Sequence, residues 1–487
     1  MDDFILVQRS PRSIPLAAVA GVPVPQMVQM IASATNVGGG VYDSVAGNNY
    51  TYKKEVQAGN AILILCTWPN GSTPTFTDNN GNTWPAVVTA VNNIIGNNNS
   101  GYCLLTGARA GVTTIKATFA SAVIPFHWNI IEYYNVTGHN GVSPGSANAT
   151  GPSLSCGSFT PGNNNAGGGN LIVSYFAIST NDTTTTNGPN PWTAGSGQTL
   201  LEADMSCYFG TQTAPQQGGF AHATQSILQT TAAAINPAIT ATSDTTNTYN
   251  CFAVALTVGA AGTPRPSTIW IAKIIHQSIN GNSTNPSTVK LQVPWIGNLR
   301  FAAALTGNTG SISATDSDSS TWVNEALAEN DLFAYAQNTA PDANSTITFA
   351  IGAWGGNPNY TFRFYDIVNA PASAFDNFVS GPNGGSLNGA STLIGNPVIT
   401  PVASSGLMIA NVGLETGPGL SVTAPVGAVY DMTGYTGETD QDNYDNADLA
   451  CHFYFSSNAQ ISCSWTLTNQ PSNNSVAGSY AITFKGS

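Results

Sequence analysis

The segment Gly59-Asn-Ala-Ile-Leu-Ile-Leu-Cys66 recurs 238 residues later as Gly297-Asn-Leu-Arg-Phe-Ala-Ala-Ala304. Each copy is a short apolar run that follows a Gly-Asn pair, which is typical of a strand that begins after a turn. The recurrence indicates an internal repeat, so the rest of the chain decides how far the repeat extends.

Five further pairs of segments follow in the same order, at offsets between 232 and 244 residues. Chance composition does not keep six matches in order with so small a drift, so the pattern predicts a tandem duplication. The further pairs are 76–84 with 314–322, 113–115 with 345–347, 128–133 with 362–367, 169–173 with 405–409, and 203–209 with 447–453.

The composition favours strands. Only 8% of the 487 residues are charged, against roughly a quarter in an ordinary soluble domain. A surface of hydroxyls and amides suits strands and turns, and short apolar runs alternate with turn-forming residues along the chain. We therefore expect an all-β fold of two tandem antiparallel β-sandwich domains, jelly-roll-like, over 28–259 and 268–487, with a linker at 260–267. The nearest approach to a helix is 322–331.

The charge and the cysteines exclude several classes of protein. A formal net charge of −13 with twelve Lys and Arg argues against binding to nucleic acid or to an anionic membrane. No apolar run is long enough to span a bilayer, and the acidic opening Met1-Asp-Asp does not resemble a secretory signal. The seven cysteines form no C-x-x-C pair, so we expect buried, reduced thiols.

Residues 1–27 have no counterpart in the second copy and are rich in proline and apolar residues. They are interpreted either as a tail or as an extended arm that lies along the sheet edge of a neighbouring subunit, where strand addition satisfies its backbone groups. The residues expected to anchor such an arm are Ile14, Leu16, Val19, Val22 and Val24.

The segment Phe76-Thr-Asp-Asn-Asn-Gly-Asn-Thr-Trp84 reads as a tight turn. Asp78 is expected to accept backbone N–H groups in an Asx turn, Gly81 to take a positive φ, and Trp84 to cover one end of the core. Asp316 and Trp322 hold the same places in the second copy. We expect all five residues to be structural.

This turn, followed by a Thr-Thr-Ile strand and by Ile130-Ile-Glu-Tyr-Tyr134, resembles a module of phage and bacterial surface proteins that carries a T-D-x-x-G-N-T-[WY] hairpin and a later [VA]-x-E-[YF] strand. The resemblance covers most of 28–260. The second copy departs from it, with Ser317-Asp-Ser-Ser320 in the turn and Asp366 in place of Glu132. The resemblance implies a jelly-roll-like sandwich with a structural or adhesive role, and it supplies no catalytic residues.

The residues themselves predict no enzyme. Glycoside hydrolysis needs two neighbouring carboxylates, yet Glu132 and Asp366 each stand alone on their strands, and Glu202 with Asp204 is the only close pair in the first copy. The five histidines show no zinc-binding spacing, and no nucleophile or phosphate-binding motif is present. A glycoside hydrolase is the third-ranked hypothesis.

One acidic loop, at 438–448, lies where the offset between the matched segments increases from 236 to 244 residues. Its oxygen ligands at alternating positions suit Ca²⁺, although a solvated acidic loop is the alternative. The candidate ligands are Glu438, Asp440, Asp442, Asp445 and Asp448. No other cofactor is expected.

The sequence thus favours a structural, non-enzymatic bacteriophage virion protein, either a capsid decoration or a tail-associated or fibre protein. Such a protein would assemble in the host cytoplasm with copies of itself and with other coat or tail proteins. Adhesion to surface glycans would use Trp68, Trp192 and Tyr435, if they are exposed. The alternative is an extracellular bacterial filament subunit or a carbohydrate-binding adhesin at the cell surface.

Overall fold

The structure is a computed structural model of the whole chain. It describes residues 22–35, 49–69, 73–93, 98–120, 126–147, 153–163, 169–180, 192–209, 219–241, 248–281, 288–306, 312–326, 331–351, 359–380, 386–387, 392–394, 398–415, 421–423, 427–432, 446–463, 465–468 and 474–486. These residues form strands, turns and irregular segments, which confirms the all-β prediction. No helix in them is long and apolar enough to cross a membrane.

The strands fall into four consecutive sets. The first set is β1 (Gln26–Thr35), β2 (Asn49–Val56), β3 (Ala61–Pro69), β4 (Thr75–Asp78), β5 (Val88–Asn93), β6 (Asn98–Leu105), β7 (Gly111–Thr118) and β8 (Phe126–Tyr134). The second is β9 (Val136–Val142), β10 (Ser146–Ala147), β11 (Ser153–Ser155), β12 (Asn170–Thr180), β13 (Trp192–Ala194), β14 (Thr199–Phe209), β15 (Gly219–Gln229), β16 (Ala238–Ala241) and β17 (Thr248–Val258).

The second half of the chain continues in the same way. The third set is β18 (Trp270–Gly281), β19 (Thr288–Gln292), β20 (Leu299–Thr306), β21 (Ile312–Asp316), β22 (Val323–Ala326), β23 (Asp331–Gln337), β24 (Thr346–Ile351) and β25 (Asn359–Val368). The fourth is β26 (Phe375–Ser380), β27 (Ser386–Leu387), β28 (Thr392–Ile394), β29 (Val398–Ile399), β30 (Gly406–Glu415), β31 (Ser421–Thr423), β32 (Val429–Met432), β33 (Asn446–Phe455), β34 (Ile461–Ser462), β35 (Trp465–Thr468) and β36 (Asn474–Lys485).

The same strand order recurs in every set when the strands are counted without the two-residue strands β10, β27, β29 and β34. In the first set, a five-stranded sheet has the order β1-β8-β3-β6-β5 and a three-stranded sheet has the order β2-β7-β4. The other sets repeat this order as β9-β17-β12-β15-β14 with β11-β16-β13, as β18-β25-β20-β23-β22 with β19-β24-β21, and as β26-β36-β30-β33-β32 with β28-β35-β31. Each half of the chain therefore contains two similar sets of strands.

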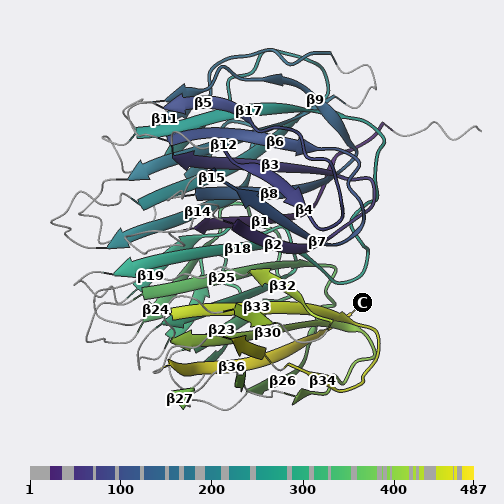
Figure 1. Cartoon of the computed structure of the whole chain (residues 1–487), viewed down its shortest axis with the longest axis vertical. Helices are drawn as coiled ribbons and strands as arrows, with labels where there is room; N and C mark the ends of the chain where they lie inside the picture. The colour runs from purple at the N-terminus through teal and green to yellow at the C-terminus, as the bar shows by residue number, and fades with distance from the viewer. Residues whose placement is uncertain are drawn as a thin grey trace, which may run out of the picture.

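The sheets form stacked layers. The three-stranded sheet of the first set packs on one face of its five-stranded sheet, where Phe76 stacks on Trp128 at 6.0 Å. The opposite face packs on the five-stranded sheet of the second set, where Tyr102 meets Phe252 at 6.3 Å. Figure 1 shows the strands of the first half, purple to teal, above those of the second half along the long axis.

This layering explains the segment from 59 to 66. In β3, Ile62 and Ile64 face the interior of the first set, while Leu63 and Leu65 face the second set. A strand covered on both faces is apolar throughout rather than alternating. The side chains of Ala61 to Cys66 are accordingly at most 1% exposed.

The first half and the second half are joined through β18. Its start pairs in parallel with β1, from Met30 opposite Lys273 to Ser33 opposite His276. Its end pairs in parallel with β14, where Cys207 lies opposite Ile279. On its other side β18 pairs with β25 along nearly its whole length. One strand therefore connects the first, second and third sets.

The linker predicted at 260–267 is held to the first set by hydrogen bonds. The amide of Thr263 donates to the side-chain oxygen of Asn60 at 2.8 Å, and the amide of Arg265 donates to that of Gln26 at 3.0 Å. The carbonyl of Ala261 accepts from the amide of Asn135 at 2.9 Å. This segment is fixed rather than a free tether.

Two expectations from the sequence are wrong. Residues 323–326 form β22 rather than a helical turn, because they pair with β23 at the edge of a sheet. The match between 203–209 and 447–453 joins strands that are not equivalent. The former lies in β14, the fifth position of its set, whereas the latter lies in β33, the sixth position.

Candidate functional site

The first predicted turn is built around Asp78 at the end of β4. One carboxylate oxygen accepts from the amides of Asn80 at 2.8 Å and Asn82 at 3.2 Å, and the other accepts from Trp84 Nε1 at 2.6 Å. Gly81 has a φ of +72°. Burial opposes ionisation, but the hydrogen bonds from Asn82, Trp84 and Asn80 outweigh it and lower the pKa of Asp78. All of its described contacts are internal.

The second turn keeps the backbone contacts but changes the partner. Asp316 accepts from the amides of Asp318 at 3.1 Å and Ser320 at 2.9 Å. Its other oxygen lies 2.6 Å from Arg300 Nη1, which also contacts the carboxylate of Asp318 at 2.5 Å. The Arg300 guanidinium is 1% exposed and lies over the Trp295 ring at 5.4 Å. The turn is thus closed by a buried ion pair.

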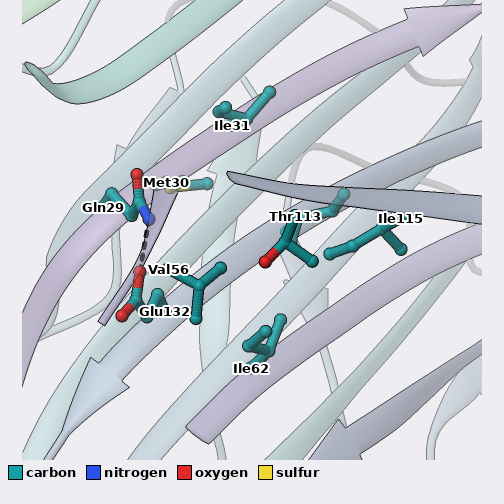
Figure 2. A pocket seen from close by; sticks show the side chains of 9 residues that line it. Gln29, Met30, Ile31, Val56, Ile62, Thr113, Ile115 and Glu132 are labelled. Carbon is teal, nitrogen blue, oxygen red and sulfur yellow. Dashed lines mark hydrogen bonds between the residues drawn. The ribbon is translucent and has the colours of Figure 1, made fainter. Parts of the chain in front are cut away.

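Glu132 lies inside the first set, 2% exposed, on β8. Its carboxylate accepts from the amide of Gln57 at 2.8 Å and from Asn60 Nδ2 at 2.6 Å, and Gln29 Nε2 donates to the second oxygen. Figure 2 shows Gln29 and Glu132 joined beside Val56. These three donors are all neutral amides, which form charge-assisted hydrogen bonds with the carboxylate.

A small cavity of about 20 Å³ adjoins this group. Apart from Glu132, Gln29 and Thr113, it is lined by apolar side chains that include Ile62 and Ile115 (Figure 2). A volume of roughly 10–15 Å³ accommodates one water molecule, so this cavity does not have the dimensions of a sugar subsite. Glu132 is positioned to hold strands together rather than to meet a substrate.

Asp366 takes the equivalent place on β25, where it is 1% exposed. Its carboxylate accepts from the amides of Ile296 at 2.7 Å and Gly297 at 2.6 Å, and Lys273 Nζ lies 3.7 Å away. Burial raises the pKa of Asp366 and lowers that of Lys273, and the attraction between the two charges opposes both shifts. Here a cation replaces the neutral Gln29 of the first half.

A polar cluster lies between the first and second sets. Asn129 of β8 donates to the Glu202 carboxylate at 2.8 Å and to Thr224 Oγ1 at 2.8 Å. Beside it, the rings of His127 and His222 stack with centroids 3.2 Å apart. Asp204, the other member of the acidic pair with Glu202, lies opposite His222 in the strand register. No motif in the sequence indicated that Glu202, His127 and His222 would lie together.

The imidazoles of this cluster are held neutral. Burial lowers the pKa of His127 well below 6.5, and burial together with the neighbouring His127 lowers that of His222. His127 Nδ1 lies 3.0 Å from the hydroxyl of Tyr175, which in turn lies 3.1 Å from Thr67 Oγ1. Glu202 and His222 are both fully buried. The cluster therefore acts as a polar contact between two sheets.

A second polar cluster lies between the third and fourth sets. Arg363 Nη1 donates to Asn411 Oδ1 at 3.2 Å, and the Tyr365 hydroxyl donates to the Asp431 carboxylate at 2.8 Å. The other oxygen of Asp431 contacts His452 Nδ1. All five side chains are at most 3% exposed. Both halves thus place buried polar groups between their two five-stranded sheets.

The aromatic residues named for glycan contact do not support that role. Trp68 is fully buried and Trp192 is 3% exposed, so the expectation that they stack on glycans is wrong for both. Trp68 packs in the core of the first set and Trp192 in that of the second. Tyr435 lies outside the described residues.

The predicted calcium loop and arm lie mostly outside the described residues. Asp448 is opposite Gly413 in the register of β33 and β30, and the other four acidic residues of the loop, at 438, 440, 442 and 445, are not described. In the described part of the chain, no group of three or more His, Cys, Asp or Glu could hold a metal ion. Of the arm, Val22 and Val24 are described, at 65% and 63% exposure.

Six of the seven cysteines are described as buried, free thiols. Burial raises the pKa of Cys103 and of Cys463 to about 12. A protonated, buried thiol is a poor nucleophile. These cysteines serve as small apolar residues in the cores.

No protein-family model matches the chain, and no curated protein matches it. Two solved structures of arabinofuranosyltransferase AftD from mycobacteria are similar to it at very low scores. A mutant form has a TM-score of 0.12 and 9% identity over 95% of this chain and 44% of that chain. The other has a TM-score of 0.13 and 12% identity over 89% and 39%. The chain spans less than half of either structure, and scores this low carry no information about its fold or function.

Proposed function

We propose that the chain is a structural, non-enzymatic protein of a bacteriophage particle, a capsid decoration or a tail-associated or fibre protein, that acts by assembling with copies of itself and with other coat or tail proteins. We further propose that the sequence duplication comprises the domains 28–259 and 268–487, and that each set of strands is a jelly roll.

The observation that carries this proposal is how the described charged groups are used. Lys273, Arg300 and Arg363 are at most 1% exposed, and each contacts a buried partner in the interior. Glu132, Glu202 and Asp366 are equally buried. These buried charged groups hold the layers of sheets together through polar contacts. We expect the layers to form a rigid block, which suits a component of a particle.

The jelly-roll proposal is supported by the strand order. Each set places its first, eighth, third and sixth strands side by side and its second, seventh and fourth in the facing sheet. Two interlocked Greek keys produce such an arrangement of eight strands.

The alternatives receive less support from the described residues. A hydrolase needs an accessible acid pair, whereas Glu132 is 2% exposed and accepts hydrogen bonds from three amides. An adhesin that stacks sugars on aromatic rings would need exposed rings, and Trp68 and Trp192 are buried.

Immuno-electron microscopy of particles from the native source tests the proposal. Antibodies against the purified chain are expected to decorate a capsid or a tail at regular intervals. Labelling of cell-surface filaments instead would favour the extracellular alternative and overturn the virion proposal. Release of reducing sugar from bacterial glycans that is lost in Glu132→Gln would overturn the non-enzymatic proposal.

A further inference from the structure

Ten strands of the sixteen-stranded sheet form one continuous run through the middle of the molecule, in the order β5-β6-β3-β8-β1-β18-β25-β20-β23-β22. β1 and β18 are parallel at its centre, and every other pair of neighbours is antiparallel. β5 and β22 therefore run in the same direction, at opposite ends of this run. Both are the fifth strand of their sets.

The three-stranded sheets of the first and third sets lie on opposite faces of this run of strands. The interior of the first set, with Ile64 and Ile115, is continuous with the contact between the third and fourth sets. The interior of the third set, with Ile347 and Phe349, is continuous with the contact between the first and second sets. Across the parallel β1–β18 pair, the three-stranded sheets thus alternate sides.

Other strand edges are covered by the chain itself. The side chain of Asn140 in β9 donates to the carbonyl of Gly162 at 3.1 Å, and the Gly162 amide donates to the Asn140 carbonyl at 3.0 Å. In β26, the Asp376 carboxylate accepts from the amides of Val402 at 3.0 Å and Ala403 at 2.9 Å. Loops that cover edges in this way prevent pairing with another chain.

The fifth strands are treated differently. β14 pairs in parallel with β18 of the next set, and β32 lies against β2. In the part of the chain that the structure describes, the backbone of β5 pairs only with β6, and that of β22 pairs only with β23. β5 also lies near β10 and β17, and the side chain of Asn324 in β22 exchanges hydrogen bonds with the backbone of Ala314 at 2.7 and 3.2 Å. Val88 in β5 is 43% exposed, and Glu325 in β22 is exposed. The fold therefore uses one fifth strand for a parallel contact between sets and leaves two equivalent ones at the two ends of this ten-strand run.

We propose that β22 of one copy pairs in parallel with β5 of the next copy, so that copies of this chain join head to tail. This inference rests on the proposed assembly function and identifies the contact that carries it. The new pair repeats the arrangement at β1 and β18, because the strands are parallel and the three-stranded sheets continue to alternate sides. A contact between two different edges leaves one edge of each type free at the ends of a dimer. Further copies can therefore add, and the product is a filament, or a ring if the rotation between copies closes.

The contact is short, because β5 has 6 residues and β22 has 4. A pair of this length forms few main-chain hydrogen bonds, each with a net contribution of about 1 kcal/mol. Assembly is therefore expected at high protein concentration and to reverse on dilution.

Complementation between two blocked variants tests the head-to-tail contact. Thr89→Pro in β5 and Glu325→Pro in β22 each remove one N–H and place a ring at the edge, while Thr89→Ser and Glu325→Gln are the matched controls. By sedimentation velocity over a hundredfold range of concentration, the unmodified chain and both controls should form species larger than a dimer. Each proline variant alone should remain monomeric, and their equimolar mixture should form a dimer and nothing larger.

Two outcomes of this experiment overturn the proposal. A proline variant that still associates alone shows that another surface is used, or that like edges pair with one another. A mixture that stays monomeric, while the unmodified chain associates, shows that β5 and β22 are not partners. Thermal melting of each variant establishes whether it is folded.

Hydrogen exchange on the unmodified chain keeps the proposal testable if the proline variants do not fold. Amides of 88–93 and 323–326 should exchange at least about tenfold more slowly in the assembled sample than in the dilute one, while those of β26 should not change. Assembly without this protection would overturn the contact and leave the proposed function standing. A chain that stays monomeric at every concentration, and that also fails to label any particle, would overturn both.

Discussion

The two halves of the chain hold equivalent carboxylates in different ways. In the first half, Glu132 and Asp78 accept from neutral amides and an indole. In the second half, the equivalent Asp366 and Asp316 face the cations of Lys273 and Arg300. The backbone donors of each turn are retained, so the element common to both halves is the carboxylate with its main-chain contacts. The side chain that completes the site is interchangeable.

The difference has an energetic consequence. A carboxylate held by neutral donors can lose one of them and still be partly solvated by the rest. A buried ion pair that loses one member leaves an uncompensated charge in the interior, which costs more than the pair contributed. The second half should therefore be more sensitive to single substitutions at these sites than the first.

The largest effect is expected at Arg300. Arg300→Met should lower the free energy of unfolding by about 3–5 kcal/mol, because it leaves Asp316 buried without a counter-charge. The equivalent first-half residue is Ile62, and Ile62→Met should cost less than about 1.5 kcal/mol because its volume is conserved. Urea denaturation monitored by tryptophan fluorescence compares the two. Equal losses would contradict the proposed difference between the halves.

The next effect is expected at the two strand acids. Asp366→Asn should cost about 3 kcal/mol, because the buried Lys273 then loses its ion-pair partner, and Glu202 acts on it only as a lesser electrostatic neighbour. Glu132→Gln should cost about 1–2 kcal/mol, because the three described donors are neutral amides that lose charge-assisted hydrogen bonds. Thermal unfolding at neutral pH measures both. A larger loss for Glu132→Gln would show that the neutral donors are not sufficient on their own.

A smaller effect is expected at the first turn. Asp78→Ala should cost about 1–3 kcal/mol, since it removes the hydrogen bonds to Asn80, Asn82 and Trp84. The pKa of Asp78 is lowered from 3.8, so the stability it contributes is complete above that value and is lost as the pH falls through the lower folded pKa. Asn82→Ala removes the side-chain donor Nδ2, which lies 2.9 Å from the Asp78 carboxylate, and keeps the backbone donors. Acid unfolding below pH 4 should therefore begin at a higher pH in this variant.

The smallest effect near neutral pH is expected from the histidines. Burial lowers the pKa of His127 and His222 well below 6.5, and that of His276 to about 3. The unfolded chain takes up protons first, so stability is complete above pH 6.5 and decreases below it. At pH 6 each histidine should contribute a loss of under about 1 kcal/mol. His222→Phe should flatten the pH dependence of urea unfolding between pH 7 and 5, and an unchanged slope would contradict this assignment.

Local features of the fold could be predicted from the sequence. Asp78, Gly81 and Trp84 form a turn whose contacts lie within seven residues, so the sequence contains all that determines it. The apolar run at 61–66 similarly indicated a buried strand. The Gly-Asn pairs at 59–60 and 169–170 each stand at the start of the third strand of a set, and they were the available signal that the first half holds two sets.

The polar clusters could not be predicted in the same way. Asn129 and Glu202 are 73 residues apart, as are many pairs that do not meet. They meet because two sheets stack face to face, which depends on the register of strands rather than on spacing along the chain. Trp68 and Trp192 were misjudged for a related reason. A tryptophan on a strand is exposed only if nothing covers that face, and here a second sheet covers it.

The position of β18 also constrains how the chain can fold. Strand β1, which begins at Gln26, finds its parallel neighbour only when the chain has been made as far as Lys273. Until then one edge of the first five-stranded sheet is without its native partner, a state that favours pairing with other chains. Closing a loop of this length is slow, because contacts distant in sequence limit folding rates. The first half should therefore depend on a chaperone, or on rapid completion of the chain, until β18 reaches it.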